Sequence, residues 1–466
     1  MPAQLDGNTA WGVVLGRYLL GPEQFGERQR YSGERNLLVF GPNGSGKGTR
    51  FLMPNLLQMQ DCSMVVIDPK GELAAVTAPW RRTVGEVVVI NPFGVLADRP
   101  GYEDLRSDGY NPLLALEPAA DSFNADASWL AEALVTVEGS DPHWSRSARK
   151  LVAALIMHVC LKAHGVDRGS PSLAEMRRLL TEPVIEPAKD EPGHGIPTTA
   201  IAMRRWGLPA LSMKAGQFTR WNREIESVVS TADTQTEALD DAEIAADLAK
   251  PGIDFRALKQ RPITVYVILP PDMMERHGRW LRMIISSALR AVMRLREPGE
   301  KRVFFLMDEF AALGHLSIIE TTWALVRGYG IQLVPVLQDL NQLKELYKDR
   351  WETFIGMAGV VEAFGPNDLT TADWLSRRSG DATEVVMGYN ISQQPGGGAA
   401  GVSEGVNYHQ VKIPRLTPHE LFDTPEGHAH VFLANMANRV PLYVPAYYEI
   451  AAARERARDN PYFAAG

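Results

Sequence analysis

The sequence of 466 residues has little cysteine, with Cys62 and Cys160 as its two members. They lie far apart, without the short spacing by which cysteine and histidine ligands hold zinc. The ten histidines form no metal-like cluster along the chain. Nothing in the sequence therefore calls for an oxidising compartment or a structural metal, and we expect two buried, inert thiols.

Long apolar runs are also lacking, since no uninterrupted run reaches the ~18 residues that a helix needs to cross a bilayer. The longest candidates, 129–137 and 151–160, are typical of core helices. The N-terminus lacks the basic-then-apolar order of a signal peptide. We therefore expect a soluble, cytoplasmic chain.

An excess of positive charge is the third absence, because 48 Lys and Arg face 56 Asp and Glu, which gives a formal charge of −8. Binding of nucleic acid would therefore need a local patch or an internal channel. The hydrophobic content of 45% is that of a globular protein. The length allows two or three domains with large cores.

The most informative stretch is a glycine-rich segment near the N-terminus. An apolar run at 37–40 predicts a buried strand, which breaks into a glycine-rich turn and then into a helix. In this context small residues let backbone N–H groups close around a triphosphate, and a lysine neutralises the phosphates. An ordinary turn is the alternative. The residues expected to bind a nucleoside triphosphate are Gly41, Pro42, Asn43, Gly44, Ser45, Gly46, Lys47, Gly48 and Thr49.

The position after Lys47 usually carries Ser or Thr, whose hydroxyl holds Mg²⁺. Here that position is Gly48, and Thr49 follows it. Thr49 is therefore the candidate hydroxyl ligand for Mg²⁺.

The rest of the chain alternates apolar strands with polar loops and helices, which favours an α/β fold with a mostly parallel sheet covered on both faces. We expect such strands at 64–67, 86–90, 263–269, 303–307, 331–337 and 359–364. Between them the strand signal disappears over 116–250, which predicts a large inserted all-α domain. Residues 1–115 and 251–466 would then form two parts of one nucleotide-binding domain.

Two further segments carry expectations. A helix over 276–296 has an apolar side and an arginine side, for which a solvated or intersubunit role is favoured over contact with nucleic acid. The glycine-rich stretch 395–405 predicts a mobile loop.

A second half of the site is needed for hydrolysis, namely an apolar strand that ends in an acid. Asp308 and Glu309 follow such a strand. Asp308 would hold Mg²⁺ through its water shell, and Glu309 would orient or deprotonate the attacking water. Gln338, at the end of the next strand, is placed to sense the γ-phosphate, with an ordinary loop amide as the alternative.

Transfer of a phosphoryl group also needs positive charge near the γ-phosphate. Arg35 and Arg327 are the candidate arginine fingers, acting within the chain or across a subunit interface. A surface or salt-bridged arginine is the alternative for each.

These features together resemble the TraG/TraD-type coupling proteins of conjugation and type IV secretion. The specific strings are Asp68-Pro-Lys-Gly-Glu72 and Asp308-Glu-Phe-Ala-Ala-Leu-Gly314, and the likeness runs from about Gly33 to Tyr448. The family also commonly has glycine where Gly48 stands. The resemblance implies a RecA-like P-loop ATPase that uses ATP and Mg²⁺ and assembles as a hexamer.

The resemblance further implies delivery of relaxase–DNA or effector proteins to other secretion components at the cytoplasmic face of the bacterial inner membrane, with DNA passing through a central pore. The expected transmembrane helices of such proteins are missing from this sequence. Two alternatives remain open: a DNA translocase of the FtsK/HerA type outside secretion, and a substrate receptor that binds ATP with little turnover.

Overall fold

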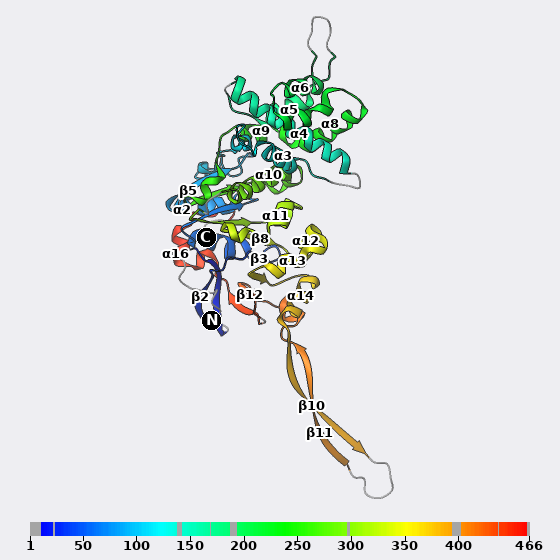
Figure 1. The fold of residues 1–466 in the computed structure, drawn as a ribbon. Helices are drawn as coiled ribbons and strands as arrows, with labels where there is room; N and C mark the ends of the chain where they lie inside the picture. The colour runs from blue at the N-terminus through cyan, green and yellow to red at the C-terminus, as the bar shows by residue number, and fades with distance from the viewer. Residues whose placement is uncertain are drawn as a thin grey trace.

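The molecule is elongated, with a large sheet at its centre, helices gathered at one end and a two-stranded ribbon extending from the other (Figure 1). This computed structural model describes residues 11–21, 24–137, 142–167, 169–186, 193–295, 299–393, 402–436 and 438–463, and for 167, 390–393 and 402–405 the backbone alone.

Eleven strands of the described residues form one sheet in the order β2-β1-β13-β12-β9-β3-β8-β7-β4-β6-β5. Their bounds are β1 (Val13–Gly21), β2 (Gln24–Tyr31), β3 (Leu37–Phe40), β4 (Cys62–Ile67), β5 (Glu86–Ile90), β6 (Ile263–Val267), β7 (Arg302–Met307), β8 (Ile331–Leu337), β9 (Val360–Phe364), β12 (His428–Leu433) and β13 (Val440–Tyr443).

The part of the sheet from β9 to β5 is parallel, and β12, β13, β1 and β2 continue it as antiparallel strands. Successive side chains of a strand point to opposite faces, so the apolar strands feed two cores. Phe304 and Phe305, for example, lie in different clusters of buried side chains. This is the predicted α/β architecture, and the parallel strands bring their carboxyl ends to one edge.

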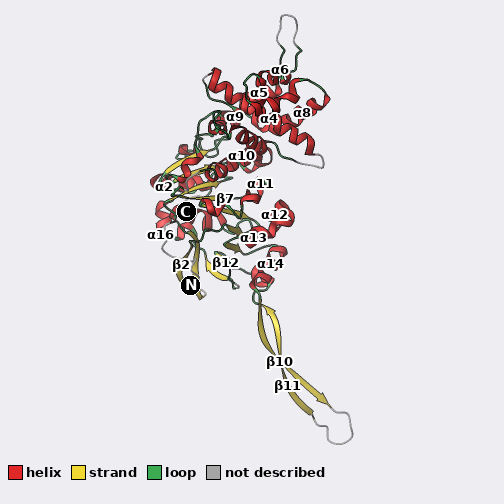
Figure 2. Cartoon of the chain, viewed as in Figure 1, coloured by secondary structure: helices red, strands yellow, loops and turns green. Residues whose placement is uncertain are grey.

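Helices cover both faces of the sheet (Figure 2). They are α1 (Met53–Gln58), α2 (Glu72–Val84), α10 (Met274–Met293), α11 (Ser317–Thr322), α12 (Leu340–Tyr347), α13 (Trp351–Met357), α14 (Leu369–Ser379), α15 (Pro418–Phe422) and α16 (Ala451–Arg456). Leu56 of α1 packs in one core and Leu281 of α10 packs in the other. Within the described ranges, no helix combines the length and apolar character needed to cross a membrane.

The segment predicted as an insertion contains helices α3 to α9. Apart from an isolated bridge between Ile185 and His194, its described residues form no strand. The helices are α3 (Phe123–Leu134), α4 (Pro142–Lys162), α5 (Leu173–Thr181), α6 (Ile196–Arg204), α7 (Pro209–Gly216), α8 (Arg223–Thr236) and α9 (Ala242–Leu248). The long α4 lies at the centre of this group, with Leu151, Leu155 and Ile156 buried. Cys160 on α4 and Cys62 on β4 are buried free thiols, as expected.

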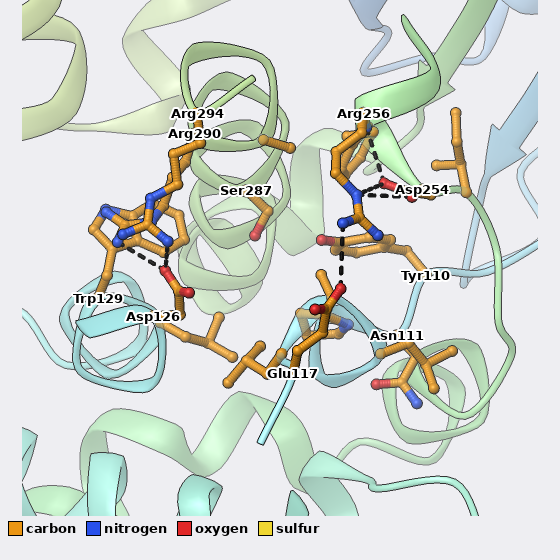
Figure 3. Close-up of a pocket in the computed structure, with 18 of the residues that line it drawn as sticks. Tyr110, Asn111, Glu117, Asp126, Trp129, Asp254, Arg256, Ser287, Arg290 and Arg294 are labelled. Carbon is orange, nitrogen blue, oxygen red and sulfur yellow. Dashed lines mark hydrogen bonds and ion pairs between the residues drawn. The ribbon is translucent and has the colours of Figure 1, made fainter. Parts of the chain in front are cut away.

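The arginine side of α10 faces the helical insertion (Figure 3). Arg290 and Arg294 both pair with Asp126 of α3, at 3.0 Å between Arg290 Nη2 and Asp126 Oδ1 for the first pair. The Arg290 guanidinium also lies 4.8 Å from the centroid of the Trp129 ring. The expected solvated face is confirmed for Arg294, which is exposed, whereas Arg290 is half-buried, and both arginines join α10 to α3 of the helical segment.

A cavity of about 490 Å³ lies beside these ion pairs, at the junction of the insertion and the sheet domain. The two chain segments that enter and leave the insertion line it, around 110–117 and 251–256. On its far side Arg256 pairs with Asp254 at 2.9 Å and with Glu117 at 3.4 Å (Figure 3). Arginine–carboxylate pairs thus fasten both sides of the junction.

The ribbon at the other end consists of β10 (Asp381–Gln393) and β11 (Val402–Pro414). They pair antiparallel along their whole length, from Asp381 opposite Pro414 to Gln393 opposite Val402. Of the stretch 395–405, which is expected to be mobile, residues 402–405 belong to β11, and the remainder lies outside the described residues.

Candidate active site

The glycine-rich loop follows β3, which lies between β9 and β8 in the parallel part of the sheet. Gly41 N donates to Leu337 O of β8 at 3.0 Å, so the start of the loop is fixed to the neighbouring strand. Gly44 and Gly46 have φ of 81° and 87°, a region that favours glycine. The chain then turns directly into η1 (Lys47–Leu52), a π-helical turn that leads into α1. This is the strand–loop–helix arrangement of a phosphate-binding loop.

Lys47 lies inside this loop. Its ammonium donates to the carbonyl oxygens of Gly41 and Pro42, at 2.5 and 3.0 Å. Burial lowers the pKa of Lys47, and the carboxylates of Glu309 and Asp308 oppose that change. The predicted loop lysine and the predicted acid pair therefore share one electrostatic site.

A separate observation indicates that this loop can bind a phosphate group. The Ser45 hydroxyl is buried and has no hydrogen-bond partner among the described residues. A buried hydroxyl without a partner is costly, and a phosphate oxygen would accept a hydrogen bond from it. Next to it, a side chain at Gly48 would meet no atom within 4 Å, so the position usually taken by Ser or Thr is open. Thr49 Oγ1 lies 3.4 Å from Gly46 O, within the same turn.

The acid pair stands at the carboxyl end of β7. Glu309 N donates to Asp308 Oδ1 at 3.1 Å, and the Glu309 backbone adopts φ 49° and ψ 48°, a left-handed conformation. Gln338, at the end of the adjacent β8, donates from Nε2 to Glu309 Oε2 at 3.1 Å. Burial raises the pKa of Asp308 to about 6, with Glu309 acting in the same direction and Lys47 opposing it. The structure thus brings Lys47, Asp308, Glu309 and Gln338 together.

A third acid and a second lysine, to which no role was assigned from the sequence, belong to this site. Asp68 follows β4, which pairs with β7 so that Ile67 lies opposite Met307. Burial raises the pKa of Asp68 to about 7, and the nearby Asp308 adds to the effect. The positive charge of Lys70 lowers the pKa of Lys47, which places the two ammonium groups within electrostatic reach. The string Asp68–Glu72 after a buried strand was the available signal.

The C-terminal segment holds the loop that carries Lys70. The Tyr462 hydroxyl donates to Lys70 O at 2.7 Å, and Asn460 Nδ2 donates to Glu72 Oε1 at 2.7 Å. Asn460 is buried. These contacts join residues almost 400 positions apart, so no local pattern in the sequence could indicate them.

Arg35 and Arg327 lie away from this cluster. Arg35 precedes β3, and Arg327 belongs to η10 (Val326–Tyr329), which precedes β8. Since β3 and β8 are adjacent and parallel, both arginines lie at the amino edge of the sheet, opposite the phosphate loop of their own chain. Arg327 is exposed to solvent. Neither arginine joins the site within one chain.

The sheet order, the loop after β3 and the acid pair after β7 define the fold class as a RecA-like P-loop NTPase domain with a helical insertion. The chain belongs to the family described as type IV secretory system conjugative DNA transfer, which it matches over residues 8–460. This confirms the family resemblance found in the sequence.

Individual relatives agree with this placement. The chain is 27% identical to the conjugal transfer protein TraG of Escherichia coli, over 98% of this chain and 72% of the relative. It is 25% identical to the protein VirD4 of Agrobacterium fabrum, over 83% of this chain and 55% of the relative.

Among solved structures, the bacterial conjugative coupling protein TrwBdeltaN70 matches with a TM-score of 0.61 and 17% identity, over 88% of this chain and 85% of that one. The plasmid coupling protein TrwB in complex with the ATP analogue ADPNP matches with a TM-score of 0.61 and 18% identity, over 89% of this chain and 86% of that one.

Proposed function

We propose that this chain is an ATP-hydrolysing coupling protein of a type IV secretion or conjugation system. The observation that carries the proposal is the cluster at the carboxyl edge of the sheet, where Glu309 is hydrogen-bonded to Gln338 and shares a site with Asp308 and Lys47. A protein that only bound nucleotide would not need a carboxylate held in a left-handed backbone conformation beside the phosphate loop. Membership of the conjugative DNA transfer family supports the same function.

In this proposal the residues of the site divide the work. Lys47 and the loop around Ser45 would bind the phosphates of ATP. Asp308 and Thr49 would hold Mg²⁺, which neutralises phosphate charge when it is bound. Glu309 would accept the proton of the attacking water, and the amide of Gln338 keeps that carboxylate oriented.

The proposal includes a ring of identical copies, six by analogy with the family, on the cytoplasmic side of the inner membrane. A ring would give Arg35 and Arg327 a role. They lie at the edge of the sheet opposite their own phosphate loop, so they would act at the site of a neighbouring subunit. In a head-to-tail ring the amino edge of one subunit would face the phosphate loop of the next. The ring would deliver relaxase–DNA or effector proteins to other secretion components, with DNA in a central pore.

The first test is the turnover of ATP by the purified chain and by its Glu309→Gln variant. We expect the variant to bind ATP and to lose at least about 100-fold in kcat, because the group that accepts the proton is removed. Glu345→Gln, an exposed position on α12, is the matched control and should retain full turnover. Equal turnover of Glu309→Gln and the wild type would contradict the assignment of the base.

The same assay separates the classes of substrate. Strong stimulation by single-stranded or duplex DNA would indicate a DNA motor, whether in secretion or as a translocase of the FtsK/HerA type. Turnover that is indifferent to DNA would indicate protein substrates. Tight ATP binding without turnover at any protein concentration would favour a receptor.

A further inference from the structure

The β10–β11 ribbon extends away from the body (Figure 1). Several of its large apolar side chains are exposed. We propose that this ribbon is an arm that packs on a second copy of the chain. Five side chains in the middle of the ribbon form what we call the ribbon patch. They are Val385, Met387, Tyr389, Val406 and Tyr408, exposed by 55, 55, 75, 47 and 68%.

The register of the ribbon places this patch on one face. Met387 lies directly opposite Tyr408, and Tyr389 lies opposite Val406. Directly opposite residues of an antiparallel pair share a face, and residues two apart on a strand share it too. Val385 therefore continues the same surface, and the patch is contiguous rather than scattered.

An isolated ribbon of this kind needs a partner. A two-stranded hairpin alone is marginally stable in water, and both outer edges here leave backbone groups unpaired. At ~3.3 Å per residue and ~4.8 Å between strands, each face of thirteen residue pairs measures roughly 40 by 10 Å, or about 400 Å². One such face therefore offers about half of the ~800 Å² that one partner contributes to a standard protein–protein interface.

Charge argues against nucleic acid or an anionic membrane as the occupant. Among the described side chains of the ribbon, those of Asp, Glu, Lys or Arg are Asp381, Glu384 and Lys412. The surface is therefore not basic. Binding to phosphate backbones or anionic lipids requires clustered Lys or Arg. The chemistry of the ribbon patch instead suits an apolar protein surface.

A second copy of the chain offers such a surface. Leu325, Tyr329 and Met357 are exposed by 59, 40 and 45%, and they precede β8 and β9 at the amino edge of the sheet. A ribbon of roughly 40 Å exceeds the ~30 Å diameter of a small domain, so it can cross the surface of a neighbour. This inference rests on the proposed function, because the ring proposed there supplies the second copy that receives the ribbon.

The test is photo-cross-linking of the purified full chain with benzoylphenylalanine placed at Tyr389 or at Tyr408. We expect light-dependent products at multiples of 51.5 kDa, which increase when a nonhydrolysable ATP analogue favours assembly. The matched control carries the same group at Met213 of α7, which is 82% exposed in the helical insertion. It should give no such products.

A disruptive variant gives a second readout. Tyr389→Lys combined with Tyr408→Lys should raise the protein concentration needed for assembly at least about tenfold, because aromatic anchors dominate interfaces. Met213→Lys should leave that concentration unchanged. The ribbon lies outside the cores, so nucleotide binding by the double variant checks that the body remains folded.

Three outcomes would overturn the inference: cross-links from Tyr389 and Tyr408 that go only to added single-stranded DNA, no cross-links while mass measurements show assembled rings, and a monomeric chain under every condition. Turnover of ATP is measured in the same samples. If the wild type did not hydrolyse ATP, that result would count against the proposed function alone. Cross-linking would still show whether the ribbon contacts a second copy.

Discussion

At the scale of single residues, the buried carboxyl group of Asp68 and the half-buried one of Asp308 make the stability of the chain depend on pH. Asp68 and Asp308 end neighbouring strands, and in the folded chain their pKa values rise from 3.8 to about 7 and about 6. The folded state therefore binds more protons than the unfolded state between about pH 4 and pH 7. These groups therefore contribute fully to the free energy of unfolding below about pH 4. Their contribution is lost as the pH rises from about 4 to about 7.

Asp308→Asn should remove part of this pH dependence. Without nucleotide, we expect the variant to be more stable than the wild type at pH 7.5, by on the order of 1–2 kcal/mol, and equally stable near pH 4. Urea unfolding at several pH values measures the difference. Asp373→Asn, at an exposed position on α14, is the control and should track the wild type throughout. A variant that is less stable than the wild type at pH 7.5 would show that the carboxylate of Asp308 is stabilised rather than strained.

Most residues of the site could be predicted because their signals are local. The loop Gly41–Thr49 and the acids Asp308 and Glu309 each follow an apolar strand, and the carboxyl ends of parallel strands meet at one edge. The left-handed conformation of Glu309 and its hydrogen bond to Gln338 could not be predicted, since they depend on how β7 and β8 are placed.

At the scale of elements, the C-terminal segment is hydrogen-bonded to the loop between β4 and α2 through Asn460 and Tyr462, and we call these two contacts the clasp. Tyr462 and Asn460 hold that loop from outside, at Lys70 and Glu72. The loop carries both Asp68, beside Asp308, and Lys70, within electrostatic reach of Lys47. The clasp therefore links the end of the chain to the geometry of the phosphate site.

Asn460→Ala should loosen this clasp. Loss of a buried amide that is bonded to a carboxylate costs about 1–3 kcal/mol, so we expect a lower Tm and a KM for ATP raised several-fold with a smaller change in kcat. Steady-state kinetics and thermal unfolding measure both effects. Phe463→Ala, 63% exposed at the end of the described chain, is the control. If KM were unchanged while Tm fell, the segment would serve stability alone.

The elements that could not be predicted share a physical cause. The β10–β11 ribbon buries neither face in its own chain, so its sequence lacks the alternation that marks a half-buried strand. The pairing of Arg290 and Arg294 with Asp126 joins residues more than 160 positions apart. Both features depend on surfaces that meet only after folding.

At the scale of the whole molecule, two groups of candidate site residues lie at opposite edges of one sheet. The phosphate loop and Glu309 are at the carboxyl edge, and Arg35 and Arg327 are at the amino edge. Within one chain the two groups stay apart, whereas a head-to-tail ring joins two different surfaces of the chain at every interface and, as proposed here, would bring these two edges together. The proposed ring therefore predicts that each active site combines residues of two different subunits.

Mixing two inactive variants tests this arrangement. Lys47→Ala lacks a working phosphate loop and retains Arg327, whereas Arg327→Ala retains the loop and lacks the arginine. In equal mixtures, about half of the sites have a working loop and about half of those face an intact Arg327, so random rings should recover about a quarter of wild-type turnover. Arg35→Ala is tested against Lys47→Ala in the same way.

The matched control for this mixture pairs Lys47→Ala with Glu309→Gln, whose defects lie at the same edge of one chain. That mixture should recover nothing, because no site regains both its lysine and its base. Recovery in the arginine mixtures and not in the control identifies the arginine that acts across the interface. Mixed rings that form but stay inactive with both Arg35→Ala and Arg327→Ala would exclude both residues from that role, and would leave the charge near the γ-phosphate to groups of the same chain.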